Sequence, residues 1–499
     1  MPFPSTGCEP CRTRRVKCDE TQPVCKRCAR TCTACYGARQ AFSMVHTENP
    51  YASGRKKRPR GPRSTKEVGL ATKLDCILTR SPFDLQTEAV AFYVHYYLQG
   101  KGDAPPLVQS AMDDVELTLS SKAPCQVLYL AVSTLALAVF SRVRQHPQAA
   151  SEASIKYQQL LQALQVRLRA LDQNNIDTCL LANFFMSMYE DSLHRPDPTT
   201  KTATSRTLRS LPHQEGALAI LKFWRDHLST KQPATKVIKH TRRSAIKRAL
   251  VGNFALPEWI VDGASFGEQG LELEYDSILA RISNARHALS RIIKQMNNLQ
   301  PASTDQASTL KILYSETQDI DRALQDWKIR FPSAWSARRH TLPGSQSSST
   351  EFFYSSSIHS HESPACAAVW LRYYSSRMLV NSTCLTILEL LEPDTGGITE
   401  DQFLEYLSCI KEMSDGLAST IPFSLERFAI INNIVVVGMT ENTKPSLGTL
   451  AINPLSIASS IRHVDMEHKL WFKSQLARIG RETGYGLFES AMTNEWLDF

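Results

Sequence analysis

From residue 84 to residue 499, apolar side chains recur at the spacing of one face of an α-helix, whereas strand-like alternation and hairpin turn residues are rare. The periodic segments predict helices over 85–98, 125–143, 153–171, 178–190, 215–228, 275–299, 308–329, 367–391 and 400–417. We therefore expect a large all-α domain over 84–499, long enough to bury one large hydrophobic core or two.

Two stretches interrupt the helical pattern. Residues 195–210 are rich in Pro, Thr and Arg, and residues 340–364 contain nine serines between Ser345 and Ser363. Both compositions are typical of mobile loops or disordered insertions. The serine-rich stretch suits either phosphorylation or a plain tolerated insertion. Its His359 and His361 form a lone HxH motif, which favours solvent exposure.

An uncharged run over 123–141 has about the length of a membrane span, which needs roughly 20 apolar residues. The run contains a proline and several polar residues, and it lies within a series of amphipathic helices. A buried core helix is therefore the simpler interpretation. The apolar run 430–439 is too short to span a bilayer, so we expect no membrane partner.

Residues 8–35 differ from the rest of the chain because they hold seven of its thirteen cysteines. Two copies of a CxxC motif are each followed by six residues and another cysteine, and the copies are seventeen residues apart. This repeat predicts two related half-sites. The repeated cysteines are Cys8, Cys11, Cys18, Cys25, Cys28 and Cys35. Cys32 falls outside the repeat and could compete with Cys35 as a ligand or act as an oxidisable thiol.

The cysteines are expected to be reduced, because residues 1–7 contain two prolines and no apolar run of the kind found in a secretory signal. Reduced cysteines at this spacing favour metal ligands over a disulfide framework. Zinc prefers four ligands in a tetrahedron, so two separate thiolate sites would need eight cysteines. Six cysteines suffice only if two of their thiolates bridge the metals.

Six thiolates and two zinc ions leave a negative charge that basic side chains can balance. The basic residues between the cysteines are Arg12, Arg14, Arg15, Lys17, Lys26, Arg27 and Arg30. A metallothionein-like or redox-switch metal site needs no such residues and is the weaker alternative. A segment of about thirty residues cannot bury enough apolar surface to fold alone, so metal binding would supply most of its folding free energy.

Positive charge is confined to the beginning of the chain. Residues 1–73 carry a net charge of +11, whereas the whole chain carries +8 and residues 74–499 sum to −3. A field of this kind attracts the phosphates of nucleic acid and makes affinity dependent on salt. We therefore expect a cysteine-rich domain over 1–37 and a basic flexible linker over 38–83.

The linker contains the sequence RKKRPRGPR, in which Pro and Gly rule out a regular helix. Its basic residues are Arg55, Lys56, Lys57, Arg58, Arg60 and Arg63. They suit nuclear localisation, phosphate contact or both, against the alternative of a merely solvated linker. Only one or two apolar turns follow at 68–78, too few for a zipper, so monomeric DNA binding and dimerisation through the large domain both stay open.

The cysteine spacing resembles that of the fungal binuclear zinc cluster (Zn(II)2Cys6) transcription factors, in which CxxC, six residues and Cys precede a loop and a second such set. Asp19 after the third cysteine and Pro23 before the fourth also resemble the family. The resemblance implies two Zn2+ ions bridged by Cys8 and Cys25. Cys11 and Cys18 would complete one site, and Cys28 and Cys35 the other.

In that family, a short helix between the second and third cysteines enters the major groove and reads a CGG triplet. The resemblance implies that residues 12–17 form this helix and that Arg12, Arg14, Arg15 and Lys17 contact DNA. Arg15 stands where the family usually has a lysine. Arginine can make a two-pronged contact with guanine, so reading of G is retained while the full triplet becomes less certain.

The resemblance implies a nuclear transcription factor that reads GC-rich triplets near genes transcribed by RNA polymerase II. Its partners would be double-stranded DNA, the transcription machinery or coactivators, and possibly a second copy of itself as a homodimer. HQEGALAILKFWR, at 213–225, is similar to a helix of the helical regulatory domain found in many such proteins, although its apolar residues also suit an ordinary core helix. The alternative is a zinc- or redox-responsive protein that acts through protein contacts without base-specific DNA binding.

The last six residues, NEWLDF, mix acids with large apolar side chains. They suit either a short activation segment or a final helix that packs on its own domain. No phosphate-binding loop, nucleophile elbow, HExxH or GxGxxG motif is present, so we expect that the protein is not an enzyme.

Overall fold

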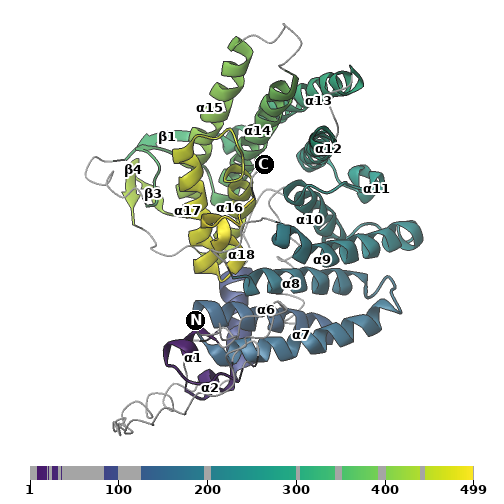
Figure 1. Ribbon diagram of the computed structural model, residues 1–499, viewed down its shortest axis with the longest axis vertical. Coiled ribbons are helices and arrows are strands. Elements are labelled where there is room, and N and C mark those ends of the chain that lie inside the picture. The colour runs from purple at the N-terminus through teal and green to yellow at the C-terminus, as the bar shows by residue number, and fades with distance from the viewer. Residues whose placement is uncertain are drawn as a thin grey trace, which may run out of the picture.

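The computed structural model describes residues 8–19, 21, 25–31, 35, 84–98, 125–195, 204–298, 304–342, 351–391, 400–438, 444–497 and 499. The expected linker over 38–83, with its basic cluster at 55–63, therefore lies outside the described residues, as does Cys32. The described part consists of a small cysteine-rich segment and a large helical body (Figure 1).

The body is built from helices of four to twenty-nine residues. They are α4 (Leu85–Tyr93), α6 (Gln126–Val143), α7 (Pro147–Leu168), α8 (Ile176–Leu193), α9 (Thr204–Phe223), α10 (Lys236–Gly252), α11 (Glu258–Val261), α12 (Gly270–Asn298), α13 (Thr304–Ile329), α14 (Pro364–Leu391), α15 (Glu400–Ser424), α16 (Pro445–Ala458), α17 (Met466–Thr483) and α18 (Gly486–Glu489). Wider π-helical turns continue α4 over Val94–Leu98 and α9 over Trp224–Leu228.

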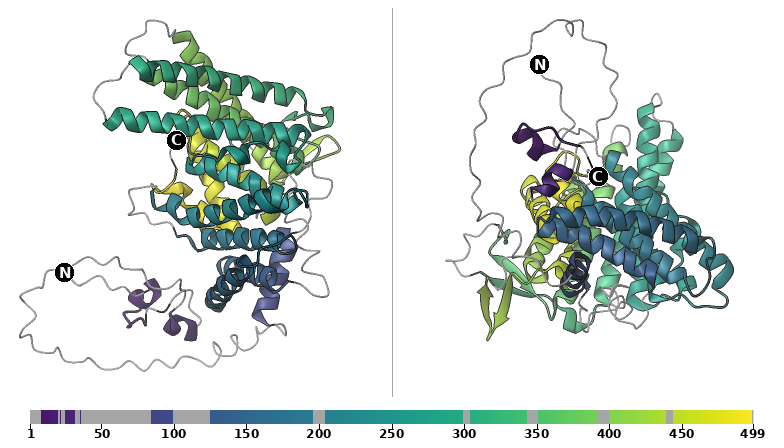
Figure 2. Two further views of the ribbon diagram at one scale, coloured as in Figure 1. Left: turned by 90° about the vertical axis from the view of Figure 1, so that its right-hand side faces the viewer. Right: turned by 90° about the horizontal axis from the view of Figure 1, so that it is seen from below.

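The helices are stacked in chain order along the long axis of the body (Figure 2, left). The pair α6 and α7 lies at one end, α8 to α10 and α12 follow, and α13 to α15 lie at the other end (Figure 1). The C-terminal helices return along this stack, because α16 packs against α14, α17 packs against α6 and α18 packs against α8. One continuous hydrophobic core extends from Ala89 to Trp496 and joins both ends of the stack.

Helix α6 is the apolar run that raised the question of a membrane span. It is long and apolar enough to cross a bilayer, but 78% of its residues are buried inside the body. Leu135, Leu137 and Val139 are fully buried against neighbouring helices. The helix ends where Gln145 takes a left-handed conformation with φ of 50°. Its burial is that of a core helix, as the sequence predicts.

Every helix predicted from periodicity corresponds to an observed helix, with bounds that differ by a few residues at most ends. Five further helices of the described body, α10, α16, α17 and the short α11 and α18, were not predicted. Helix α10 is rich in Lys and Arg, and one of these charged residues, Arg242, is fully buried. The guanidinium of Arg242 donates to the Ile260 carbonyl at 2.9 Å and lies 3.0 Å from a carboxylate oxygen of Asp276. A charged residue at a core position interrupts the apolar periodicity of α10, and that periodicity is what predicted the other helices.

The two expected loops are more ordered than their composition suggests. The backbone of 204–210 belongs to α9, so the prediction of a loop over 195–210 is wrong for its second half. Within 340–364, strand β2 (Ser357–Ser360) pairs antiparallel with β1 (Arg338–Thr341). The prediction of a loop is therefore also wrong for β2, because this strand packs against α15. Residues 196–203 and 343–350 lie outside the described part.

His359 and His361 are buried, with 6% and 7% of their surfaces exposed, so the expectation of solvent exposure is wrong. His359 lies on β2, and its Nδ1 is 3.3 Å from the Thr420 hydroxyl on α15. Burial lowers the pKa of each imidazole to about 4, so both are neutral at physiological pH. They are packed core residues.

The short apolar run at 430–439 contains a hairpin. Strands β3 (Phe428–Ile431) and β4 (Ile434–Val437) pair antiparallel. Asn432 and Asn433 connect them, and both have positive φ, at 52° and 63°. Asparagine tolerates this conformation better than most residues, and two such residues in sequence suit the tight turn of a two-residue hairpin loop.

The C-terminal segment packs against the body. The Trp496 indole is 4% exposed and donates to the Ser459 hydroxyl at 2.9 Å. The Phe499 amide donates to the Ser460 carbonyl at 2.7 Å, and Glu495 lies 3.2 Å from His194. The segment is therefore part of the folded domain. Its described residues, 494–497 and 499, do not form the helix that the sequence suggested as the alternative to an activation segment.

We predict that Trp496→Ala lowers the free energy of unfolding by about 3 to 5 kcal/mol, because it removes a large buried side chain and leaves a cavity. Urea unfolding followed by circular dichroism would measure the change. Met492→Ala is the matched control, since the Met492 side chain is 54% exposed in the same segment and should alter stability little. Equal stability of the two variants would show that the C-terminal segment does not pack as described.

Candidate metal centre and nucleic-acid interface

The two CxxC motifs each begin a short helix. Helix α1 (Glu9–Thr13) starts directly after Cys8 and contains Cys11, and α2 (Lys26–Arg30) starts directly after Cys25 and contains Cys28. In α2, the Cys25 sulfur accepts a hydrogen bond from the Cys28 amide at 3.3 Å and so caps the helix. Two cysteines three residues apart at the start of a helix lie about one turn apart, so both sulfurs point to the same side of the first turn.

The structure brings the sulfurs of all six repeat cysteines together. Cys8, Cys11, Cys18 and Cys25 form one group and Cys8, Cys25, Cys28 and Cys35 form a second, with sulfurs within 4.8 Å of one another in each group. All six are free cysteines, so the segment contains no disulfide among them. Within the described residues, these are the groups of side chains suited to hold a metal ion.

The donor set fits zinc. Sulfurs about 2.3 Å from a shared tetrahedral centre are separated by about 3.8 Å. The Cys8 sulfur lies 3.6 Å from those of Cys25 and Cys28, and the Cys11 sulfur lies 3.7 Å from that of Cys25. The Cys11 and Cys28 sulfurs, one from each group, are also 3.7 Å apart, so the two groups form one compact cluster.

Cys8 and Cys25 occur in both groups of four sulfurs. This is the arrangement that six ligands around two tetrahedral ions require, and it places the shared pair where the family resemblance implies the bridging thiolates. The remaining members divide as the repeat does, with Cys11 and Cys18 in one group and Cys28 and Cys35 in the other.

Burial favours the protonated form of most of the clustered cysteines, so a nearby cation is needed to keep them as thiolates. Burial raises the pKa of Cys8 and Cys11 above the ordinary value of a thiol and raises that of Cys28 to about 12. Burial acts in the same direction on Cys25, but hydrogen bonds from the Cys28 amide and neighbouring thiols outweigh it and lower the pKa of Cys25. Zinc, when bound, would supply the positive charge that keeps the cluster in its thiolate form.

Arg14 connects the two halves of the cluster. Its guanidinium donates to the Cys28 sulfur and to the Thr31 hydroxyl, each at 3.3 Å, and to the Pro10 carbonyl at 3.2 Å. A cation so close to a thiolate offsets part of the negative charge of the cluster. Sequence reasoning placed Arg14 among the DNA contacts but did not identify these bonds, since they depend on how the half-sites face each other.

The helix expected over 12–17 is displaced toward the N-terminus. Helix α1 spans 9–13, and the chain then turns at Arg15, whose φ is 53°. The Val16 amide donates to the Cys11 carbonyl at 2.9 Å, which is the closing bond of a Schellman motif. The prediction was wrong because an arginine in the left-handed region has no sequence signature, unlike the glycine common at this position.

The displaced helix leaves a basic turn on the surface. Arg15 and Lys17 are exposed just beyond the C-terminal end of α1, and Val16 is 37% exposed between them. Arg12 lies on the backbone of α1 itself. Cys11 and Cys18, at the two ends of this turn, belong to the same group of four sulfurs, so the turn is closed by the cluster.

Asp19 links the first half-site to the second. Its carboxylate accepts hydrogen bonds from the Thr21 hydroxyl and, at 3.1 Å, from the Lys26 amide at the start of α2. These bonds lower the pKa of Asp19 to about 2, so the group is ionised at neutral pH. The sequence had shown an aspartate directly after the third cysteine, and the structure gives it a position between the half-sites.

Comparison with known proteins gives a family for this segment. Residues 6–43 match the model of the fungal Zn(2)-Cys(6) binuclear cluster domain. The chain is also similar to a protein of Candida albicans named adhesion and hyphal regulator 1, with 48% identity over 46 residues. This match covers 9% of the chain and 7% of that relative. No solved structure matches.

We predict that Cys8→Ser removes both zinc ions, because Cys8 belongs to both groups, whereas Cys11→Ser weakens one site and leaves the other group of four intact. Elemental analysis of the purified full chain by plasma mass spectrometry would give zinc per chain. Cys409→Ser is a matched control, since that thiol lies on α15 outside both groups. If Cys8→Ser and Cys11→Ser lost the same amount of zinc, Cys8 would not be shared.

Proposed function

We propose that this protein, which carries a fungal Zn(2)-Cys(6) binuclear cluster domain at residues 6–43, is a sequence-specific transcription factor that reads CGG-like triplets in DNA. One observation carries the proposal. The exposed basic turn of Arg15 and Lys17 begins at Cys11 and ends at Cys18, which belong to one group of four sulfurs. Metal binding would then fix both ends of the segment that meets the base edges.

Two zinc ions would be held by the cluster in this proposal. Cys8, Cys11, Cys18 and Cys25 would hold one, and Cys8, Cys25, Cys28 and Cys35 the other. Bridging by Cys8 and Cys25 is favoured by the presence of both in each group of sulfurs. Arg14 would serve the cluster itself through its bond to Cys28 and would reach DNA only secondarily.

Base reading would rest on Arg15. A guanidinium donates two parallel hydrogen bonds to O6 and N7 of guanine, which a lysine ammonium cannot do with the same geometry. The carbonyl end of α1 also favours positive charge beside it, so Arg15 is held at a favourable position on the helix dipole. Arg12 and Lys17 would contact phosphates or neighbouring bases.

The division of charge supports the same proposal. Residues 1–73 carry +11, and the remaining chain carries −3. DNA would therefore meet the N-terminal region, while the helical body over 84–499 would act as the regulatory domain, bind coactivators or form a homodimer. The basic residues at 55–63 would add phosphate contacts and direct nuclear import, and the transcripts affected would be those of RNA polymerase II.

We predict that Arg15→Ala loses about 1 to 3 kcal/mol of discrimination between a CGG-containing duplex and one with the guanines replaced, because the two-pronged guanine contact is gone. Competition binding with labelled duplexes at fixed salt would measure the ratio of affinities, and zinc content should stay unchanged. Arg322→Ala on α13 is the control for loss of one exposed positive charge.

If Arg15→Ala kept the sequence preference of the unsubstituted protein, this turn would not be the part that reads the bases. If the unsubstituted protein showed no preference for any duplex while keeping its zinc, the alternative of a zinc- or redox-responsive protein that acts through protein contacts would be favoured.

A further inference from the structure

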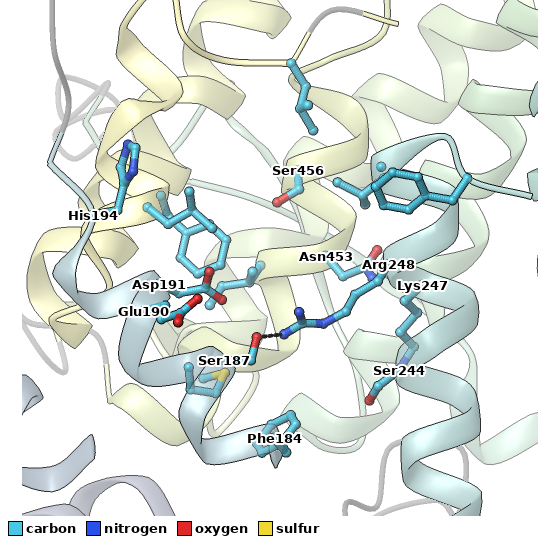
Figure 3. A pocket seen from close by; sticks show the side chains of 18 residues that line it. Phe184, Ser187, Glu190, Asp191, His194, Ser244, Lys247, Arg248, Asn453 and Ser456 are labelled. Atoms are coloured by element: carbon cyan, nitrogen blue, oxygen red, sulfur yellow. Dashed lines mark hydrogen bonds between the residues drawn. The ribbon is translucent and has the colours of Figure 1, made fainter. Parts of the chain in front are cut away.

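The helical body contains a cavity of about 300 Å³ (Figure 3). It lies where α8, α10 and α16 meet the C-terminal turn around α18, so four segments far apart in the sequence form its walls. Small-molecule sites in proteins have volumes from about 300 Å³ upward, with mostly apolar walls and few polar groups. The cavity has this volume, and its walls expose mostly apolar surface, although several polar and charged side chains also line it.

The walls are largely apolar and aromatic. Phe184 comes from α8, Phe254 follows α10, Ile452 comes from α16, and Phe488 and Leu497 come from the end of the chain. Such walls favour an apolar or aromatic body, because its burial releases ordered water. An inorganic ion or a sugar has no apolar surface large enough to pack against these aromatic and aliphatic side chains.

Arg248 supplies the main polar feature of the cavity. Figure 3 shows its guanidinium extending from α10 toward Ser187 on α8, to whose hydroxyl it donates a hydrogen bond. Within the described residues, Arg248 forms no ion pair with a carboxylate. The half-buried Arg377, by contrast, pairs with Asp321 at 2.9 Å. A guanidinium has five N–H donors in a plane, so Arg248 keeps donors for a carboxylate.

The other charges of the cavity limit the ligand to a single negative charge. Lys247 and Arg248 are balanced by Glu190 and Asp191, so the lining carries no excess of positive charge. Glu190 already accepts hydrogen bonds from Tyr157 and pairs with His213, each at 2.9 Å. A phosphate ester or a dicarboxylate would therefore meet repulsion that one carboxylate at Arg248 avoids.

We propose that this cavity binds a small monocarboxylate with an apolar or aromatic body. The carboxylate accepts hydrogen bonds from Arg248 and Ser187, and the body packs against Phe184, Phe254 and Ile452. Leu497 belongs to the turn that Trp496 and Glu495 hold against the body, so the bound molecule also contacts the C-terminal segment. This site is independent of the DNA-binding proposal, because it uses residues of the helical body alone.

Calorimetric titration of the full zinc-loaded chain tests the proposal without DNA. The probes are benzoate, phenylacetate, 4-phenylbutyrate and octanoate, each paired with its uncharged amide. We expect at least one acid to bind at one molecule per chain, with its amide about tenfold or more weaker because the charge-assisted hydrogen bonds to Arg248 are lost.

Variants of Arg248 locate the site. Arg248→Gln should weaken binding of that acid by about tenfold to a hundredfold, and Arg248→Lys should give an intermediate loss, since it keeps the charge and loses the planar fork. Arg322→Gln is the matched control and should bind as the unsubstituted chain does, because Arg322 is 71% exposed on α13. Thermal unfolding would establish that each variant is folded. If Arg248→Gln does not fold, the affinity of Arg248→Lys decides the test.

Three results would overturn the proposal. They are the absence of binding by all four acids at millimolar concentration, equal affinity for acid and amide, and full affinity in a folded Arg248 variant. None of these results would bear on DNA binding, which depends on the N-terminal cluster.

Discussion

The sharing of the Cys8 and Cys25 sulfurs between two groups of four is the constraint on which the N-terminal region depends. The described part of this segment buries almost nothing except its own cysteines, so no apolar core holds it together. Its folding free energy must then come from metal–sulfur bonds. The capping of α2 by Cys25, the bond from Arg14 to Cys28 and the closed turn at Arg15 all depend on those sulfurs meeting.

Charge divides the molecule into two parts with different chemistry. Around the cluster, an excess of thiolate charge is offset by nearby cations, and the exposed arginine and lysine side chains face outward toward any anion. In the body, several buried arginines pair with carboxylates, as Arg242 does with Asp276 in the core. Arg248 instead donates to the Ser187 hydroxyl at the edge of a cavity and forms no ion pair within the described residues, which leaves donors for a ligand.

The sequence predicted those features that depend on spacing, and it failed where tertiary contacts decide. The seventeen-residue repeat was enough to predict that six sulfurs converge, and apolar periodicity was enough for helices such as α6 and α14. The sequence could not predict that Arg15 adopts a left-handed conformation and ends α1 early. That conformation is evident only from the hydrogen bond between the Val16 amide and the Cys11 carbonyl. Helix α10 was missed and His359 was misjudged because buried polar residues such as Arg242 and His359 have the composition of a surface. The cavity was not predictable, since Phe184 and Leu497 meet only in the folded chain.

X-ray absorption spectroscopy at the zinc edge of the purified full chain tests the central claim most directly. The account predicts that each zinc has four sulfur neighbours at about 2.3 Å and that a second zinc contributes to the scattering beyond them, since the two ions share two sulfurs. Four sulfurs around an isolated zinc, or nitrogen and oxygen among its ligands, would contradict the shared cluster.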